Sequence, residues 1–223
     1  MSTRVEPVSE ALLVERIVDL VLARAGADAV DAVEPKGQRQ PDTGVPIRLL
    51  VDGHSSAHPE RLADALLAPF EAAGSPTARV SVRDFLRPRS LRLERGREDP
   101  DSLLDSWIDV GALNREVLTR VVAQGEYLPS LRDPDTDRAT RAAYVRTAPG
   151  TVVVLDGALA IGRGLDADVS VHLALKPATI RRRTPPEDAW TVPAYERYAQ
   201  EIGSAPDLVV RFDHPDHPAL VHA

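Results

Sequence analysis

Apolar residues follow two patterns along the chain: short unbroken runs, and positions repeated at intervals of three or four. The unbroken runs predict strands, which lie at residues 47–52, 78–82, 151–155, 169–175 and 207–212. The spaced positions predict amphipathic helices, which lie at about residues 9–25, 59–73, 109–124, 176–183 and 193–202. Because the strands are apolar throughout, both of their faces are expected to be covered, which is typical of a parallel sheet. The order of the elements therefore predicts an α/β fold with helices on both faces of one sheet.

Breaks in this pattern divide the chain into three parts. Gly26 is expected to end the first helix, and the Pro- and Gly-rich stretch that follows, residues 34–46, is typical of a linker. We therefore expect an N-terminal helix and linker over residues 1–46, one globular domain over 47–213 and a tail over 214–223. Inside the domain, residues 84–106 are polar and rich in arginine, which predicts an ordered loop region.

Charge and composition limit the kinds of site and partner that the protein can have. The 223 residues carry a formal net charge of −7 and include no cysteine, which excludes disulfides and thiolate metal sites. No cluster of basic residues suggests nucleic acid as a partner. The sequence begins with no signal-peptide pattern, and no apolar run reaches the roughly 18 residues that a membrane span needs. We expect a cytoplasmic protein with no membrane partner, and no pattern sets its oligomeric state.

The segment after the first strand is the first candidate site, because a doubly wound sheet binds its ligand at the carboxyl ends of its strands. A strand, a glycine-containing loop and a helix in succession are the context of a phosphate-binding P-loop. Set against the pattern G-x-x-x-x-G-K-[ST], Gly53 matches the first glycine. His58, Pro59 and Glu60 stand where the pattern has glycine, lysine and Ser/Thr.

Four further stretches extend the comparison in the same order. They are VDG followed by ERLADAL from residue 51, RDFLRPRSLRL at 83–93, VVVLDGALA at 152–160, and VHLALKPATIRRRTP at 171–185 with AWTVPAYERY after it. In this order they resemble the P-loop strand and helix, the D-D-F-Y segment, the Walker B-like strand, and the arginine-bearing lid of the uridine kinase family. The resemblance implies a three-layer P-loop NTPase-like sandwich around a mostly parallel five-stranded sheet. It also implies phosphoryl transfer from ATP, with Mg²⁺, to the hydroxyl of a nucleoside.

The resemblance assigns roles to residues of this chain. The nucleotide-binding positions correspond to Gly53, His54, Ser55, Ser56, His58, Glu60 and Arg61. In the D-D-F-Y segment the first aspartate acts as the base, and the best register puts Arg83 there. A shift by one residue would give that role to Asp84, which would otherwise cap or form an ion pair within the loop.

Two more positions correspond to parts of the family's catalytic site. Asp156, at the end of its strand, matches the carboxylate that holds Mg²⁺ through water, or it orders the adjacent turn. Arg181, Arg182 and Arg183 match lid arginines that present positive charge to the transferred phosphate, or they form a solvated basic face. At most two of them can face one site, and Arg181 and Arg182 are the two expected to do so. No histidine has neighbours at a known zinc spacing, so no structural metal is expected.

The departures in the loop oppose binding of a triphosphate. His58 adds a ring where the backbone must approach phosphate, Pro59 removes the lysine charge and an N–H donor, and Glu60 adds negative charge. The same residues suit an ordinary helix start. Three functions remain open: an impaired kinase relative that binds a nucleoside or nucleotide, an active kinase, or an interaction protein that keeps the fold alone. In the active kinase, Arg61, Arg181 or Arg182 would replace the lysine, and ATP and Mg²⁺ would be the cofactors.

Overall fold

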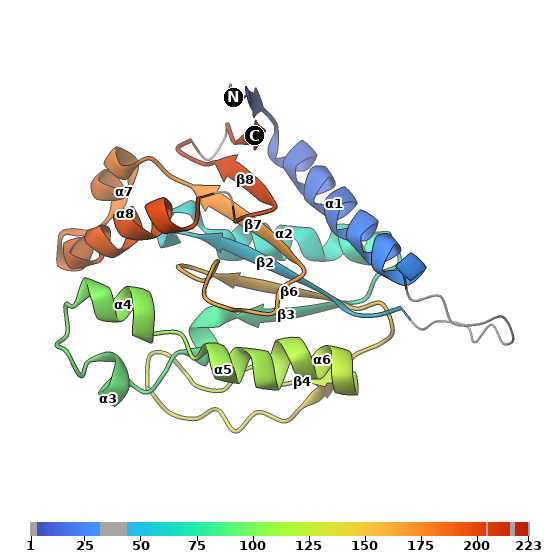
Figure 1. Ribbon diagram of the computed structural model, residues 1–223, viewed down its shortest axis with the longest axis horizontal. Coiled ribbons are helices and arrows are strands. Elements are labelled where there is room, and N and C mark those ends of the chain that lie inside the picture. Colours follow the sequence, from blue (N-terminus) through green and yellow to red (C-terminus); the bar gives the residue numbers. More distant parts are fainter. Residues whose placement is uncertain (1–3, 32–43, 204, 215–216, 223) are drawn as a thin grey trace, which may run out of the picture.

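The sheet is the middle of three layers (Figure 1). The computed structural model describes residues 4–31, 44–203, 205–214 and 217–222, with the main chain alone for 27–31. The strands of the sheet are β1 (Arg4–Pro7), β2 (Ile47–Gly53), β3 (Thr77–Ser81), β6 (Val152–Gly157), β7 (Val169–Ala174), β8 (Leu208–Arg211) and β9 (Ala219–His222). The helices are α1 (Glu10–Asp31), α2 (Pro59–Ala72), α3 (Arg89–Arg92), α4 (Pro100–Ser106), α5 (Val110–Leu113), α6 (Thr119–Gln124), α7 (Pro177–Arg183) and α8 (Val192–Glu201).

Short 3-10 turns, at Ser55–Ala57, Val82–Phe85 and Pro186–Thr191, and a two-stranded pair of β4 (Glu126–Tyr127) with β5 (Val145–Arg146) complete the described elements.

Five strands run parallel in the spatial order β3, β6, β2, β7, β8. This confirms the predicted parallel sheet, because each of the five predicted apolar runs forms one of these strands. The sheet has seven strands rather than five, since β9 pairs antiparallel with β8, and β1 pairs antiparallel with β9. Strand β2 is the middle one of the five parallel strands, so the loop that follows it opens between the ends of β6 and β7.

The two faces of the sheet carry separate apolar cores. On one face α1 and α2 place side chains such as Ile17 and Leu66 against the side chains of β2 and β6. On the other face α5, α6 and α8 cover Leu50, Val153 and Leu155. Alternate residues of β2 and β6 thus point to opposite cores, which explains why apolar residues follow one another in both strands.

The helices match their predicted positions with three differences. Helix α1 continues through Gly26 to Asp31, so the prediction that Gly26 ends the helix was wrong. The predicted helix 109–124 is continuous but contains a π-helical turn at Asn114–Leu118 between α5 and α6.

The polar segment 84–106 holds two short helices, α3 and α4. The prediction of a loop missed both helices, because the hydrophobic pattern of this segment is weak. Helix α4 begins at a polar cap: the side chain of Asp99 accepts from the Ser102 amide at 2.7 Å.

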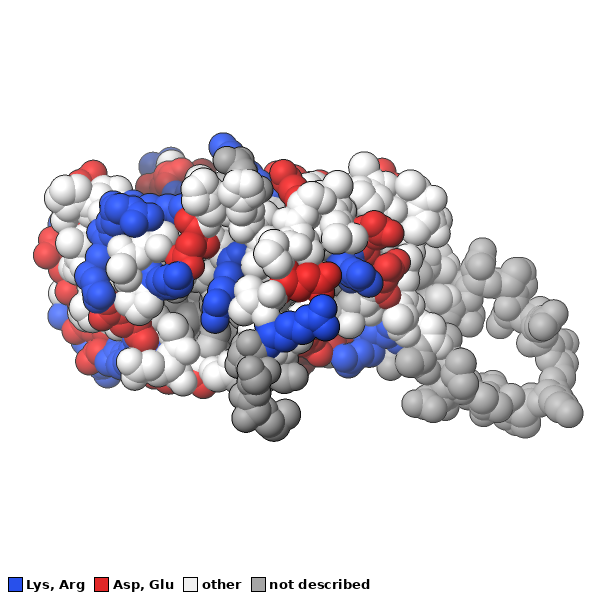
Figure 2. Space-filling view, turned by 90° about the horizontal axis from the view of Figure 1, so that it is seen from above, with Lys and Arg blue, Asp and Glu red and all other residues white. Residues whose placement is uncertain are grey.

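Most of the predicted linker lies outside the described residues, and part of the expected tail forms β9. Within the described residues no helix is both long enough and apolar enough to cross a membrane. Figure 2 shows acidic and basic side chains interspersed on the face viewed there, so this face carries no field of a single sign.

Candidate functional site

A cavity of about 600 Å³ opens at the carboxyl ends of β2, β3 and β6. Its polar wall consists of Gly53, Ser55, His58, Pro59, Glu60, Ser81, Arg83 and Asp156. Its apolar wall consists of Val82, Leu86, Leu103, Trp107, Ile108, Leu159 and Tyr195, and Gly157 and Ala158 lie between the two walls. This is the edge of the sheet at which the sequence predicts a ligand, and a pocket with an apolar wall and a few convergent polar groups is typical of small-molecule sites.

The loop between β2 and α2 uses its own amides internally. The amide of Ser56 donates to Nδ1 of His54 at 3.1 Å, and the amide of Ala57 donates to the His54 carbonyl at 2.8 Å. The amide of His58 donates to the Ser55 carbonyl at 3.0 Å. Three consecutive N–H groups that would have to point at a phosphate are therefore engaged within the loop.

His58 keeps the backbone conformation that suits the glycine of the P-loop pattern at this position. Its φ is 54°, the left-handed conformation that glycine adopts freely and other residues adopt rarely. Its Nδ1 atom lies 2.9 Å from a carboxylate oxygen of Glu60, so the ring contacts the first turn of α2. Pro59 occupies the first helical position, where its missing N–H costs nothing. The exposed Arg61 does not line the cavity, so it is not placed to act as a substitute for the lysine.

The buried ring of His54 holds the loop against the end of α7 and against α8. Its Nε2 atom lies 3.4 Å from the Thr184 hydroxyl, and the ring meets that of Tyr195 edge to face at 4.3 Å between centroids. Burial, with the nearby positive charge of Arg183, lowers the pKa of His54 to about 4. The imidazole is therefore neutral at physiological pH, with Nδ1 accepting from Ser56.

Asp156 lies buried at the end of β6 and lines the cavity. One carboxylate oxygen accepts from Nη1 of Arg79 at 2.6 Å, and the other lies 3.4 Å from the Ser81 hydroxyl. The sequence predicted Asp156 as a metal ligand but did not single out Arg79, whose strand position gave no signal of its own. Among the described residues no group of three or more His, Asp or Glu side chains could by itself hold a metal ion.

Arg83, which replaces the family's base in the best register, and Asp84, which would take that role after a shift by one residue, lie in different positions. Arg83 lines the cavity, is largely exposed, and forms an ion pair with Asp135 at 2.6 Å. Asp84 is half-buried and is not among the residues of the cavity wall. Partial burial and the charge of Asp156 raise the pKa of Asp84, which places this carboxyl group near Asp156.

The lid arginines diverge. Arg181 forms an ion pair with Glu196, and Arg182 is exposed. Arg183 turns back to the loop: its Nη1 lies 3.5 Å from the Ser56 carbonyl, and its Nη2 donates to the Asp213 carbonyl at 2.7 Å. The arginine nearest the loop is therefore Arg183, not either of the two that the sequence favoured.

A buried polar network under the loop was missed. Asp52 and His172 are direct neighbours on β2 and β7, and their side chains meet at 2.7 Å. The other carboxylate oxygen of Asp52 accepts from the Ala160 amide at 2.9 Å, and the Tyr198 hydroxyl accepts from the Ile161 amide at 2.8 Å. A signal was present, because Asp52 and His172 are ionisable residues within strands that are mostly apolar.

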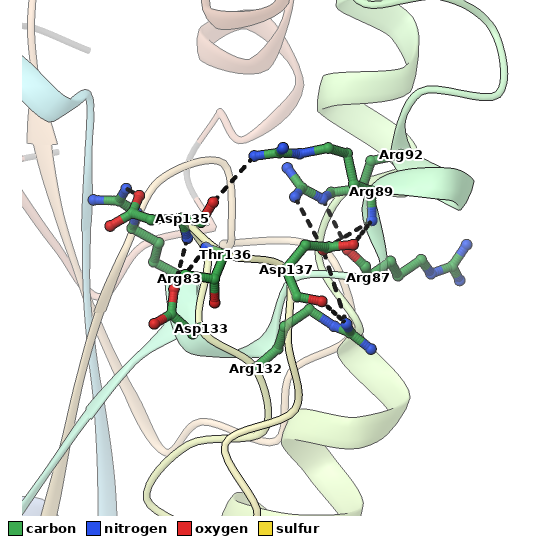
Figure 3. A network of polar contacts seen from close by, with 9 residues as sticks. All are labelled: Arg83, Arg87, Arg89, Arg92, Arg132, Asp133, Asp135, Thr136 and Asp137. Atoms are coloured by element: carbon green, nitrogen blue, oxygen red, sulfur yellow. Dashed lines mark hydrogen bonds and ion pairs between the residues drawn. The ribbon is translucent and has the colours of Figure 1, made fainter.

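An arginine cluster supports the apolar wall of the cavity. Figure 3 shows Arg92 close to Asp137, and the two atoms Nη2 and Oδ1 lie 3.7 Å apart. The guanidinium of Arg92 is buried, lies 4.8 Å from the ring centre of Trp107, and donates to the Arg87 carbonyl. Trp107 in turn contacts Trp190, at 5.8 Å between centroids, which links this wall to the segment before α8. Arg92 thus supports the cavity through its contact with Trp107.

These features are those of a P-loop kinase fold: the strand order, the loop after the central strand, the acid at the end of β6 and the arginine-bearing α7. A structure of a possible uridine kinase from Bacillus stearothermophilus is similar with a TM-score of 0.58 and 18% identity, over 85% of this chain and 98% of that one. A candidate fructose transport system kinase from Silicibacter sp. TM1040 is similar with a TM-score of 0.59 and 20% identity, over 86% and 95% of the two chains. At such identities the similarity establishes the shared fold.

Two other comparisons found nothing. No protein-family model matches the sequence, and no curated protein matches it significantly.

The residues present do not fit the nucleoside triphosphate and Mg²⁺ that this fold implies. A working P-loop supplies free amides, a lysine and a hydroxyl. Here the loop amides donate within the loop, Pro59 and Glu60 replace the lysine and the hydroxyl, and the Asp156 carboxylate is already paired with Arg79.

Proposed function

We propose that this protein uses a P-loop kinase fold to bind a small molecule, of the nucleoside or nucleotide class, without transferring a phosphoryl group. One observation carries the proposal: the loop donates its own amides to itself, at Ser56, Ala57 and His58, while Pro59 takes the place of the lysine. An anion at this loop would meet neither free N–H donors at these positions nor a lysine charge.

The cavity itself suits a ring-shaped ligand. Trp107, Tyr195 and Leu86 contribute flat and apolar surface to its lining, and Ser81, Asp156 and Arg83 contribute polar groups. Its volume of about 600 Å³ falls within the range of small-molecule pockets. A nucleoside combines an apolar ring face with hydroxyl groups, and it is the acceptor that the resemblance to uridine kinases implies.

Calorimetric titrations with uridine, cytidine, ATP·Mg²⁺ and GTP·Mg²⁺ test the proposal, together with an assay of ADP formation in the presence of each nucleoside. We expect heat of binding with a nucleoside and no ADP. Turnover would refute it, and ATP·Mg²⁺ binding in the low micromolar range would refute its premise that the loop does not accept a triphosphate. The triple replacement His58→Gly, Pro59→Lys and Glu60→Ser restores the pattern and is expected to gain ATP binding.

The position of Arg183 supports a second candidate function, an ATP-dependent kinase of nucleosides or other small molecules. Its guanidinium approaches the loop at the Ser56 carbonyl and would supply positive charge there in place of the lysine. In that case ADP formation would be measurable and would fall by about 100-fold or more in Arg183→Gln. Arg182→Gln, an exposed neighbour on the same helix, is the matched control.

Absence of binding by every nucleoside and nucleotide would instead favour a third function, an interaction protein that keeps the fold alone.

A further inference from the structure

Asp156 carries a negative charge into a buried position at the cavity. Its side chain is 10% exposed, and a buried carboxylate is tolerated only when a cation or several donors compensate it. In a site that binds a divalent metal, the metal provides that compensation, and Asp156 is the residue that the resemblance assigns to this task. The charge on Asp156 is compensated here by a side chain of the protein itself.

Arg79, on the neighbouring strand β3, provides the positive charge that compensates Asp156. In the register of β3 with β6, Ser81 lies beside Asp156 and Arg79 lies beside Val154, so the long side chain extends along the strand toward the cavity. Its Nη1 atom donates to Asp156 at 2.6 Å and to the Val80 carbonyl at 2.9 Å.

The other end of the same guanidinium reaches α2. Nη2 donates to the Glu60 carbonyl at 3.3 Å, and Nε donates to the Asp64 carboxylate at 2.9 Å. Four oxygen atoms, two from carboxylates and two from carbonyls, thus surround one cation between the end of β6 and the first two turns of α2. Carboxylate and carbonyl oxygens are also the protein ligands that Mg²⁺ and Mn²⁺ prefer.

We propose that Arg79 is a resident cation of this site: its guanidinium takes the place of a divalent metal on Asp156, so the cavity binds its ligand without Mg²⁺. Arginine remains protonated at any physiological pH and cannot diffuse away, so the compensation is permanent. A metal at the carboxylate oxygen that Arg79 holds would have to displace a charge-assisted hydrogen bond, and a metal at the other oxygen would be repelled by the guanidinium charge next to it. The inference deepens the proposed function and rests on it only for the location of the site.

The test uses Mn²⁺ as the probe, without nucleotide, so that its outcome does not depend on whether ATP is bound or turned over. The full chain is titrated with MnCl₂, and paramagnetic broadening of the Asp156 and Gly157 amide signals is followed by NMR. We expect no site-specific broadening in the wild type. Arg79→Met, which keeps the length of the side chain and removes the charge, is expected to bind Mn²⁺ on the order of tenfold or more tightly. Arg79→Met with Asp156→Asn is expected to lose that gain.

Arg48→Met is the matched control, because Arg48 also forms a partly buried ion pair with an aspartate, Asp168, on the same sheet. It should create no Mn²⁺ site at Asp156. If Arg79→Met does not fold alone, its refolding is measured with millimolar MnCl₂ or guanidinium chloride, and with urea as the neutral control. Recovery with either cation supports the inference. It is overturned if the wild type binds Mn²⁺ at Asp156 as tightly as the variant, or if neither cation binds or stabilises the variant.

Discussion

Nδ1 of His172 lies 2.7 Å from the carboxylate of Asp52, and the two residues are direct partners on the adjacent strands β2 and β7. Asp52 is fully buried and ends the strand from which the loop emerges. Its second oxygen accepts from the Ala160 amide, and burial, together with the charge of Asp52 and a hydrogen bond to it, raises the pKa of Tyr198. The pair of Asp52 and His172 therefore connects the central strands to α8 and to the turn after β6. Both of these elements contribute residues to the lining of the cavity.

The Tyr198 hydroxyl is the outermost member of this network and gives the first prediction. Tyr198→Phe should lower the free energy of unfolding by about 1–3 kcal/mol, because the buried Ile161 amide loses its acceptor. Urea unfolding measures the change. Tyr144→Phe is the control, since its hydroxyl bonds Glu116 at an exposed position, and it should cost less stability than Tyr198→Phe. Equal losses in the two variants would contradict the importance of the network.

His54 should make stability depend on pH. Its pKa is about 4 in the folded protein and about 6.5 in the unfolded chain, so between these values the unfolded chain binds a proton that the folded ring does not. The contribution of His54 is therefore fully present above pH 6.5 and is lost as the pH falls toward 4, on the order of 1–3 kcal/mol in all. Unfolding free energies at pH 7.5 and pH 5 measure it.

His54→Asn is the reference for that experiment. Its side-chain oxygen can still accept from the Ser56 amide, but it does not titrate, so the variant should lose less stability between the two pH values than the wild type. An unchanged pH dependence would show that His54 is not the group responsible.

Arg183 contributes to the low pKa of His54 through its charge. Removing that charge in Arg183→Gln should raise the pKa of His54, because the protonated ring no longer faces a nearby cation. An NMR titration of the His54 ring protons measures the shift. Arg182→Gln removes an equal charge one residue away on the exposed side of α7 and should leave the pKa nearly unchanged. A similar shift in both variants would mean that the two arginines affect the pKa of His54 only through long-range electrostatics.

Gly157 allows β6 to pass close to Val82. A Cβ atom added at Gly157 would lie 2.7 Å from the Cβ of Val82, which is buried. Gly157→Ala should therefore destabilise the protein by about 1–3 kcal/mol through overpacking. In the double variant with Val82→Ala the combined loss should be smaller than the sum of the single losses, which a double-mutant cycle measures. Simple additivity would show that the close contact is relieved in another way.

The parallel sheet was predictable because its strands are buried on both faces. Runs such as Thr151–Leu155 need no tertiary information, since β-branched residues in an unbroken run fit only a fully covered strand. Strands β1 and β9 were not predictable in the same way. Each has four residues and partly exposed positions, and each gains its stability from pairing with a strand far away in the sequence.

The location of the candidate site was predictable from the sequence, but the side chains that pair with its residues were less so. The loop at 53–60 follows from one strand, one glycine and one proline-initiated helix. The cation beside Asp156 comes from Arg79, two residues before the end of another strand, and no local pattern distinguishes it from the other arginines of the chain. The same holds for Arg183, because which of three consecutive arginines faces the loop depends on how α7 is seated.

The pairing of β1 with β9 joins residues 4–7 to residues 219–222 (Figure 1). On the ribosome, the five parallel strands can assemble once Arg211 has emerged, but until Ala219–His222 follow, the outer edge of β8 has no partner. An open strand edge is a template for association with other chains. Loss of only these last strand residues would therefore favour aggregation of an otherwise complete sheet.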